Sequence, residues 1–201
     1  SFREIAKDLT DEKSSEFHEK WVVGYGHASV AEHAVLHIAF ENSSRLAVET
    51  LQACRLASFT EKSTRYQKWG SQDFYTPEEI RQSELSGVYT STCITLFETY
   101  LHCLEVVENW LKEHAPLVEN EEPGARQRRL RTDAIDACRF LLPSAALANV
   151  GMTVNARELE HAITKMLSSP ISEVRLIGEE MKAVAMREVP TLLKYAAPSS
   201  Y

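Results

Sequence analysis

The sequence contains few cysteines, and no pattern would use them together. Its 201 residues include four: Cys54, Cys93, Cys103 and Cys138, with no C-x-x-C pair among them. This spacing suits neither a structural zinc motif nor the disulfide framework of a small secreted domain. We therefore interpret the four thiols as reduced and mostly buried, because free cysteine behaves as a small hydrophobic residue.

Long apolar runs and an excess of positive charge are also lacking. No hydrophobic stretch approaches the roughly 18 residues that span a bilayer, and Ser1-Phe2-Arg3-Glu4 does not have the pattern of a signal peptide, so a cytoplasmic location is expected. The formal net charge of -7 argues against a protein that binds duplex nucleic acid, although a local arginine cluster can still bind a phosphate. The length and the 44% hydrophobic content are those of a soluble domain with a buried core.

The spacing of hydrophobic residues predicts a helix-dominated α+β protein with one modest sheet. The clearest helix start is Thr76-Pro77-Glu78-Glu79, with threonine as the cap and proline in the first turn. Residues 34–40 are expected to form a strand that is buried on both faces, and residues 54–66 a loop that carries function. The predicted helices cover residues 2–23, a segment ending at 51, 76–114 with a bend near Gly87, 126–142, and a segment capped by Asn155. A last helix begins at residues 169–170 and ends before Pro190 or continues briefly to Tyr195.

The segment 54–66 could bind a polar ligand. Glu61, Ser63 and Arg65 occur at alternating positions and could project to one side. A carboxylate, a hydroxyl and a guanidinium together can hold a polar ring edge and a phosphate. The alternative is a solvated loop with incidental charges.

Two further basic positions lie at helix ends. Arg139 comes near the end of an apolar helix, where a cation also stabilises the helix dipole. Asn155-x-Arg157, with His161 one turn later, opens a helix, and helix N-termini bind anions. Simple dipole stabilisation and simple capping are the respective alternatives.

Other charged groups indicate no site. His27 and His33 match no standard zinc signature, and no metal is expected. The arginines between residues 126 and 131 follow several glutamates at residues 119–122, which is typical of a solvated, self-neutralising face.

Taken in order, these segments resemble the flavin-dependent thymidylate synthases, also called thymidylate synthase complementing proteins. The run Arg55-x-x-Ser58-x-x-Glu61-x-Ser63-x-Arg65-Tyr66 matches most of the family signature R-H-R-x-x-S-x-N-E-x-S-x-R-Y. Segments at compatible distances are Gly26-His27-x-Ser29-x-x-Glu32-His33, Arg139-x-x-x-Pro143, Asn155-x-Arg157-x-x-x-His161 and Glu173-Val174-Arg175. The resemblance covers the chain from about residue 24 to its C-terminus.

The resemblance implies an α+β fold with a central, mostly antiparallel sheet flanked by long helices, assembled as a homotetramer. It implies reductive methylation of dUMP to dTMP with FAD, methylene-folate and NADPH, without an enzyme nucleophile. Carried over by position, the nucleotide-binding residues are Glu61, Ser63, Arg65 and Arg139, with Arg65 and Ser63 as the catalytic pair. The flavin-binding residues are His27, Arg55, Glu61, Asn155, Arg157 and His161.

The sequence departs from the signature where the flavin is expected. Ala53-Cys54 replaces the first Arg-His pair, Thr60 replaces the asparagine, and a late arginine falls at Met166. Because a charged hydrogen bond is worth about 1.5–3 kcal/mol, two or three such losses could weaken a ligand by orders of magnitude. Three hypotheses follow: a flavin enzyme acting on a pyrimidine nucleotide, a catalytically degenerate homologue serving as a nucleotide-binding or structural partner, or an unrelated helical interaction protein. Cys54 is either a new reactive group or a small filler.

Residues 1–201 are expected to form a single domain of this family. The family's first strand, which contributes a flavin contact, has no counterpart before Phe2. The expectation is therefore a fragment of a longer chain, or a domain without that element. A longer protein with one intact and one degenerate domain would explain both this and the altered signature.

Overall fold

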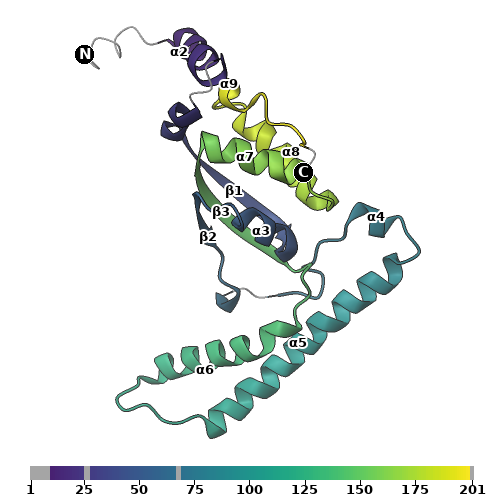
Figure 1. Ribbon diagram of the computed structural model, residues 1–201. Coiled ribbons are helices and arrows are strands. Elements are labelled where there is room, and N and C mark those ends of the chain that lie inside the picture. The colour runs from purple at the N-terminus through teal and green to yellow at the C-terminus, as the bar shows by residue number, and fades with distance from the viewer. Residues whose placement is uncertain (1–9, 25–27, 67–68, 200–201) are drawn as a thin grey trace. The chain divides into compact units, whose positions relative to one another are not determined.

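A computed structural model describes residues 10–24, 28–66 and 69–199, which form two compact units (Figure 1). The first unit comprises the chain up to residue 40, residues 47–60 and the chain from residue 150; the second comprises residues 41–46 and 61–149. No helix in the described part of the chain combines the length and apolarity of a membrane span.

A sheet of three strands has the order β1-β3-β2, with β1 at Val35–Ser44, β2 at Ala57–Glu61 and β3 at Leu147–Asn155. The Ala156 amide donates to the Ala34 carbonyl at 2.8 Å, and the Arg45 amide donates to the Ala146 carbonyl at 2.9 Å. These bonds lie at opposite ends of the β1–β3 pair, so the two strands are antiparallel. The predicted α+β class with an antiparallel sheet is confirmed.

Strand β1 is buried on one face, so the prediction of two buried faces is wrong. Leu36 and Phe40 lie in the core, whereas Val35 is 56% exposed and His37 is also exposed. Buried and exposed side chains alternate along β1, as in an antiparallel strand with one open face, although the sequence of the strand is apolar at most positions.

The predicted loop at 54–66 is also wrong in part, because residues 57–61 form β2. Their side chains alternate between half-buried and exposed, and the exposed ones are Ser58 and Thr60. Because the residues on the open face are polar, the sequence shows no run of apolar residues that would predict a strand. The strand forms by pairing with β3, which is distant in sequence.

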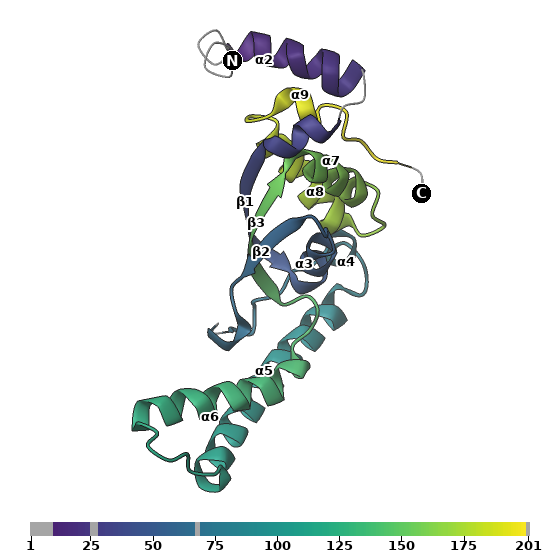
Figure 2. The ribbon, with the colours of Figure 1, turned by 60° about the vertical axis from the view of Figure 1, so that its left-hand side comes forward.

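The first unit packs helices against the buried side of its strands. Its helices are α2 (Asp11–His18), most of α3 (Arg45–Gln52), α7 (Ala156–Leu167), α8 (Ser172–Ala185) and α9 (Pro190–Leu193), with a π-helical segment at Glu19–Gly24 and a 3₁₀ segment at Ala28–His33. α7 and α8 lie side by side in both views (Figures 1 and 2). A Cβ on Gly178 of α8 would lie 3.0 Å from the Met166 Cβ, so glycine permits this close approach. The core of the unit joins Leu36, Phe40, Met152, Val154, Leu159, Ile163 and Met166.

The second unit is built on a long helical hairpin of α5 (Ser86–His114) and α6 (Pro123–Cys138), with α4 (Glu78–Arg81) preceding it (Figure 2). The predicted helix 76–114 is interrupted at residues 82–85, and Gly87 lies inside α5. Its predicted Thr76 cap is wrong, because the N-cap of α4 is Pro77 with no side-chain cap bond. The hairpin core contains Tyr100, Leu104, Ala134, Ile135 and Cys138.

The predicted neutralisation of the arginines at residues 126–131 by the glutamates at residues 119–122 is found for one pair, and a second arginine uses a different glutamate. Arg129 contacts Glu121 at 2.7 Å, and Arg131 contacts Glu108 at 3.1 Å. These partly exposed pairs contribute little stability.

Candidate functional site

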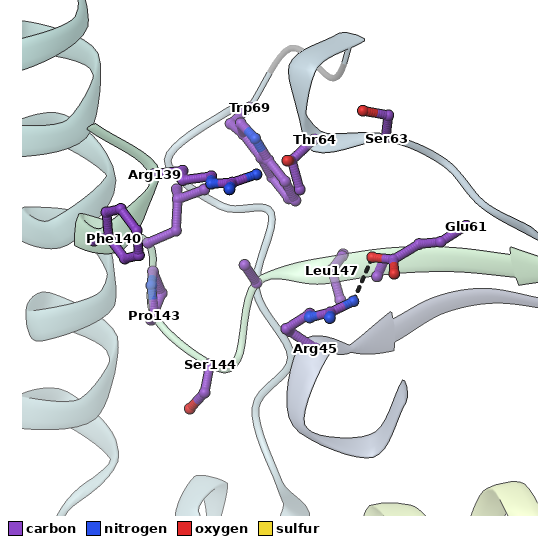
Figure 3. Close-up of a pocket in the computed structure, with 13 residues that line it drawn as sticks. Arg45, Glu61, Ser63, Thr64, Trp69, Arg139, Phe140, Pro143, Ser144 and Leu147 are labelled. Atoms are coloured by element: carbon purple, nitrogen blue, oxygen red, sulfur yellow. Dashed lines mark hydrogen bonds and ion pairs between the residues drawn. The ribbon is translucent and has the colours of Figure 1, made fainter. Parts of the chain in front are cut away.

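A cavity of about 600 Å³ lies within the second unit (Figure 3). It combines a few polar and charged side chains with an apolar wall, which is the usual composition of a small-molecule site. Its polar lining includes Arg45, Glu61, Ser63, Thr64, Arg139 and Ser144, and its apolar lining includes Trp69, Phe140, Leu142, Pro143 and Leu147. Three of the four predicted nucleotide residues therefore line one cavity.

Arg45 and Glu61 are brought together at the strand ends. Arg45 is the first residue of α3, directly after β1, and Glu61 is the last residue of β2. The Arg45 Nη1 lies 2.5 Å from the Glu61 Oε1 (Figure 3). The sequence analysis missed Arg45, because the partner lies in a strand that the sequence did not predict.

Arg65 and Arg139 meet on one carboxylate, that of Asp136. Arg65 donates to both oxygens of Asp136, with Nη2 at 2.5 Å from Oδ2, and the Arg139 Nη1 lies 3.2 Å from Oδ1. The Arg65 guanidinium holds the pKa of Asp136 below its usual value, and Asp136 in turn raises the pKa of Arg65. Arg139 lines the cavity, whereas Arg65 reaches it only through this cluster. Asp136 was missed, although it precedes Arg139 by three residues on a predicted helix.

Aromatic side chains form part of the cavity wall. The Trp69 ring lies 5.8 Å from the Phe97 ring, and its buried Nε1 has no hydrogen-bond partner among the described residues. Phe140 is 83% exposed, with the Arg139 guanidinium 5.9 Å from its ring centre. Such a wall suits a flat ring, since aromatic groups stack face to face with an offset.

The predicted flavin residues within the described part of the chain, Glu61 excepted, fall in the first unit. Asn155 caps α7, its side chain accepting from the Glu158 amide at 2.9 Å, so the capping alternative holds for this residue. Arg157 is exposed and pairs with Glu32, and His161 lies exposed one turn further along the helix. Arg55 is exposed, and His27 lies outside the described residues.

Two of the altered flavin positions, Cys54 and Met166, are buried, whereas Ala53 and Thr60 are exposed. Cys54 is 5% exposed and Met166 is 1% exposed, both in the core of the first unit. Burial raises the pKa of the Cys54 thiol, and the negative charge of Glu158 raises it further, while Lys165 acts in the opposite direction. The structure therefore supports the filler reading of Cys54. All four cysteines are free, and the prediction of reduced, mostly buried thiols is confirmed.

Cys54 is expected to resist alkylation in the folded protein. The thiolate is the nucleophile, so a raised pKa keeps the thiol unreactive up to a higher pH than usual. With iodoacetamide at pH 8, Cys54 should react much more slowly than the less buried Cys103, because the reagent must reach a side chain that is only 5% exposed and whose raised pKa disfavours the thiolate. Peptide mass spectrometry measures both rates. If Cys54 and Cys103 were both alkylated rapidly and at similar rates in the native protein, Cys54 would not be a buried, unreactive side chain.

Comparison with known proteins shows the family of this chain. The family model described as "Thymidylate synthase complementing protein" matches residues 1–191. A flavin-dependent thymidylate synthase of Clostridium tetani is 28% identical over 98% of this chain and 76% of its own length. A UPF0159 protein of Chlamydia pneumoniae is 30% identical over 93% of this chain but only 36% of its own length. The chain thus spans well under half of that relative.

A solved structure has the same fold. Thymidylate Synthase X from Helicobacter pylori, determined with FAD and dUMP, superposes with a TM-score of 0.61 at 19% identity, covering 95% of this chain and 87% of that one. Identity this low supports the fold and nothing finer. Together with the match to the family model over nearly the whole chain, it leads to one conclusion: the chain belongs to the thymidylate synthase complementing protein family.

Proposed function

We propose that the cavity of the second unit binds a pyrimidine nucleotide, and that the protein takes part in the flavin-dependent methylation of dUMP to dTMP. The observation that carries this proposal is the presence of Glu61, Ser63 and Arg139 in one cavity, with Arg65 joined to Arg139 through Asp136. The family membership and the dUMP bound to the Helicobacter pylori protein support the choice of nucleotide.

The roles of the cavity residues follow from their chemistry. The guanidiniums of Arg65 and Arg139 would bind the phosphate, because paired N–H donors match its oxygens. The Glu61 carboxylate, held by Arg45, would accept the ring N–H of the base. The Ser63 hydroxyl can donate or accept at the same ring, and Trp69 would pack against it from the apolar wall.

The first unit offers groups that fit the phosphates of FAD. Arg157 and His161 are exposed in the first turns of α7, where the helix N-terminus favours anions, and Arg55 adds a further exposed cation. The buried Cys54 and Met166 take no part in this binding. When bound, reduced flavin supplies the hydride, while NADPH and methylene-folate are the expected co-substrates.

Self-association belongs to the same proposal, with a homotetramer expected from the family resemblance. The face of β1 that carries Val35 and His37 is open in the single chain, which is compatible with burial against another copy. The chain is proposed to be one domain of the family, either alone or within a longer protein. The Chlamydia pneumoniae relative, of which it spans 36%, has room for further segments.

A second candidate function is a nucleotide-binding partner without catalysis. The specific observation in its favour is that the nucleotide residues share a cavity while Cys54 and Met166 are buried in the core where the family has basic side chains. The fold and the nucleotide site would then be kept, and flavin binding lost.

The visible absorbance spectrum distinguishes the two functions. Purified protein is titrated with FAD, with and without dUMP, and dTMP is then assayed with NADPH and methylene-folate. Bound flavin at stoichiometric occupancy, followed by dTMP formation, is the expected result. Replacement of Arg157 by glutamine should weaken FAD binding, while the matched change of the exposed Arg187 in the same unit should not. A folded oligomer that binds dUMP but no flavin at high micromolar FAD would contradict the enzyme and favour the binding partner.

A further inference from the structure

Asp136 has a position that none of the assigned roles explains. It lies on α6, one turn before Arg139, and contacts an arginine 71 residues away in sequence. The Arg65 Nε lies 3.1 Å from both oxygens of Asp136, and the Nη2 lies 2.5 Å from Oδ2. The Arg139 Nη1 lies 3.2 Å from Oδ1. One carboxylate thus joins two cations that would otherwise repel each other.

The contacts to Asp136 leave most of the guanidinium donors available. A guanidinium has five N–H groups. Asp136 engages the Nε and one Nη of Arg65, and one Nη of Arg139. Within the described part of the chain, no further acceptor is found for the other guanidinium N–H groups of Arg65 and Arg139. The cluster carries two positive charges and one negative charge, so it retains an attraction for an anion.

We propose that Asp136 is a positioning residue that holds Arg65 and Arg139 at one fixed spacing, so that together they bind the phosphate of a nucleoside monophosphate. Asp136 itself does not contact the ligand. This inference rests on the proposed nucleotide site and adds to it the residue that organises its cations. The low pKa of Asp136 agrees with this role, because the carboxyl group stays ionised at neutral pH.

Two effects of Asp136 oppose each other, and their sizes decide which one dominates. The carboxylate repels an incoming phosphate, which weakens binding. This repulsion is small here, because Asp136 is 29% exposed and its two partners are 45% and 41% exposed, so water and salt screen the charges. Holding two long side chains in place before binding avoids their loss of rotamer freedom on binding, which corresponds to about tenfold or more in affinity. Positioning is therefore the larger effect.

The test measures equilibrium binding to the full chain, without flavin, by calorimetry. The variants are Asp136→Asn, which keeps the size and removes the charge, and the control Glu113→Gln, which removes an exposed carboxylate at the C-terminal end of α5 in the same hairpin. Each variant is titrated with dUMP and with deoxyuridine, which lacks the phosphate. Asp136→Asn is expected to weaken dUMP binding about tenfold and to leave deoxyuridine binding unchanged. Glu113→Gln should change neither.

Two further variants separate positioning from a purely structural or a purely electrostatic role. Asp136→Glu keeps the charge and moves it by one methylene, so positioning predicts weaker dUMP binding in this folded variant, whereas a charge effect predicts none. When Arg65 is already replaced by glutamine, Asp136→Asn should reduce the affinity for dUMP by a clearly smaller factor than it does in the wild type. The reason is that part of the effect of Asp136 is exerted on the position of Arg65. Unchanged or tighter dUMP binding in Asp136→Asn would overturn the inference, as would an equal loss for dUMP and deoxyuridine.

Further titrations distinguish a failure of the inference about Asp136 from a failure of the proposed function. UMP, dCMP and inorganic phosphate are titrated into the same variants. If the wild type neither binds flavin nor methylates dUMP, but Asp136→Asn weakens its binding of any of these phosphates, the inference holds and the function is wrong. If the wild type binds none of the phosphates tested, the inference is overturned with the nucleotide site.

Discussion

Replacing Phe97 with alanine is expected to lower the free energy of unfolding by about 3–5 kcal/mol, the usual cost of emptying a fully buried aromatic site. Phe97 is 0% exposed on α5, with its ring 5.8 Å from that of Trp69 and 6.3 Å from that of Phe74. The alanine would leave a void between the rings of Trp69 and Phe74. Urea unfolding followed by circular dichroism measures the loss.

The matched control is Leu101→Ala, one turn further along α5. Leu101 is 41% exposed, so little apolar surface returns to water, and the expected change is within about 1 kcal/mol. Equal losses for the two variants would show that the ring cluster around Phe97 is not a tightly packed core. Since Trp69 also lines the cavity, Phe97→Ala should weaken dUMP binding as well, whereas Leu101→Ala should not.

Arg139→Gln is expected to weaken dUMP binding by about 10- to 100-fold, because each hydrogen bond to a charged group is worth about 1.5–3 kcal/mol and about 1.4 kcal/mol is tenfold. Arg139 lines the cavity and is 41% exposed on its side chain, so the protein should remain folded. Calorimetry measures the dissociation constants of dUMP and deoxyuridine. The loss should be confined to dUMP, and it should shrink as salt is added, because salt screens the phosphate–guanidinium attraction.

Arg128→Gln is the control for this change, since Arg128 is an exposed arginine on the same hairpin, outside the cavity lining. It removes the same charge from the protein as a whole. If both variants weakened dUMP equally, the affinity would come from the general field of the basic helix rather than from the cavity. An unchanged affinity in Arg139→Gln would exclude the cavity as the phosphate site.

Local features of the fold could be predicted from the sequence. The long helix α5 follows from a sustained apolar period, and the Asn155 cap from a bond that spans three residues. Both features are stabilised by interactions between residues that are close in sequence, so a short segment is enough to predict them. The order and spacing of the signature residues, which are a property of the chain alone, were also sufficient to indicate the family that the comparison established.

The open face of β1, the strand β2 and the role of Cys54 could not be predicted in this way. A polar segment such as β2 becomes a strand only when β3 offers its backbone groups, and those lie about 90 residues further along the chain. Whether Cys54 is a reactive thiol or a filler depends on the core in which it lies, and that core joins residues of β1, α3, β3 and the C-terminal helices.

The sequence by itself determined which chemical groups the site contains: the glutamate, the serine and the two arginines. Only the tertiary structure decided how they are paired, with Arg45 against Glu61 and with Asp136 between Arg65 and Arg139. The physical reason is that an ion pair depends on separation in space over a few ångströms, while the partners come from strand ends and helices that are 16 and 71 residues apart along the chain.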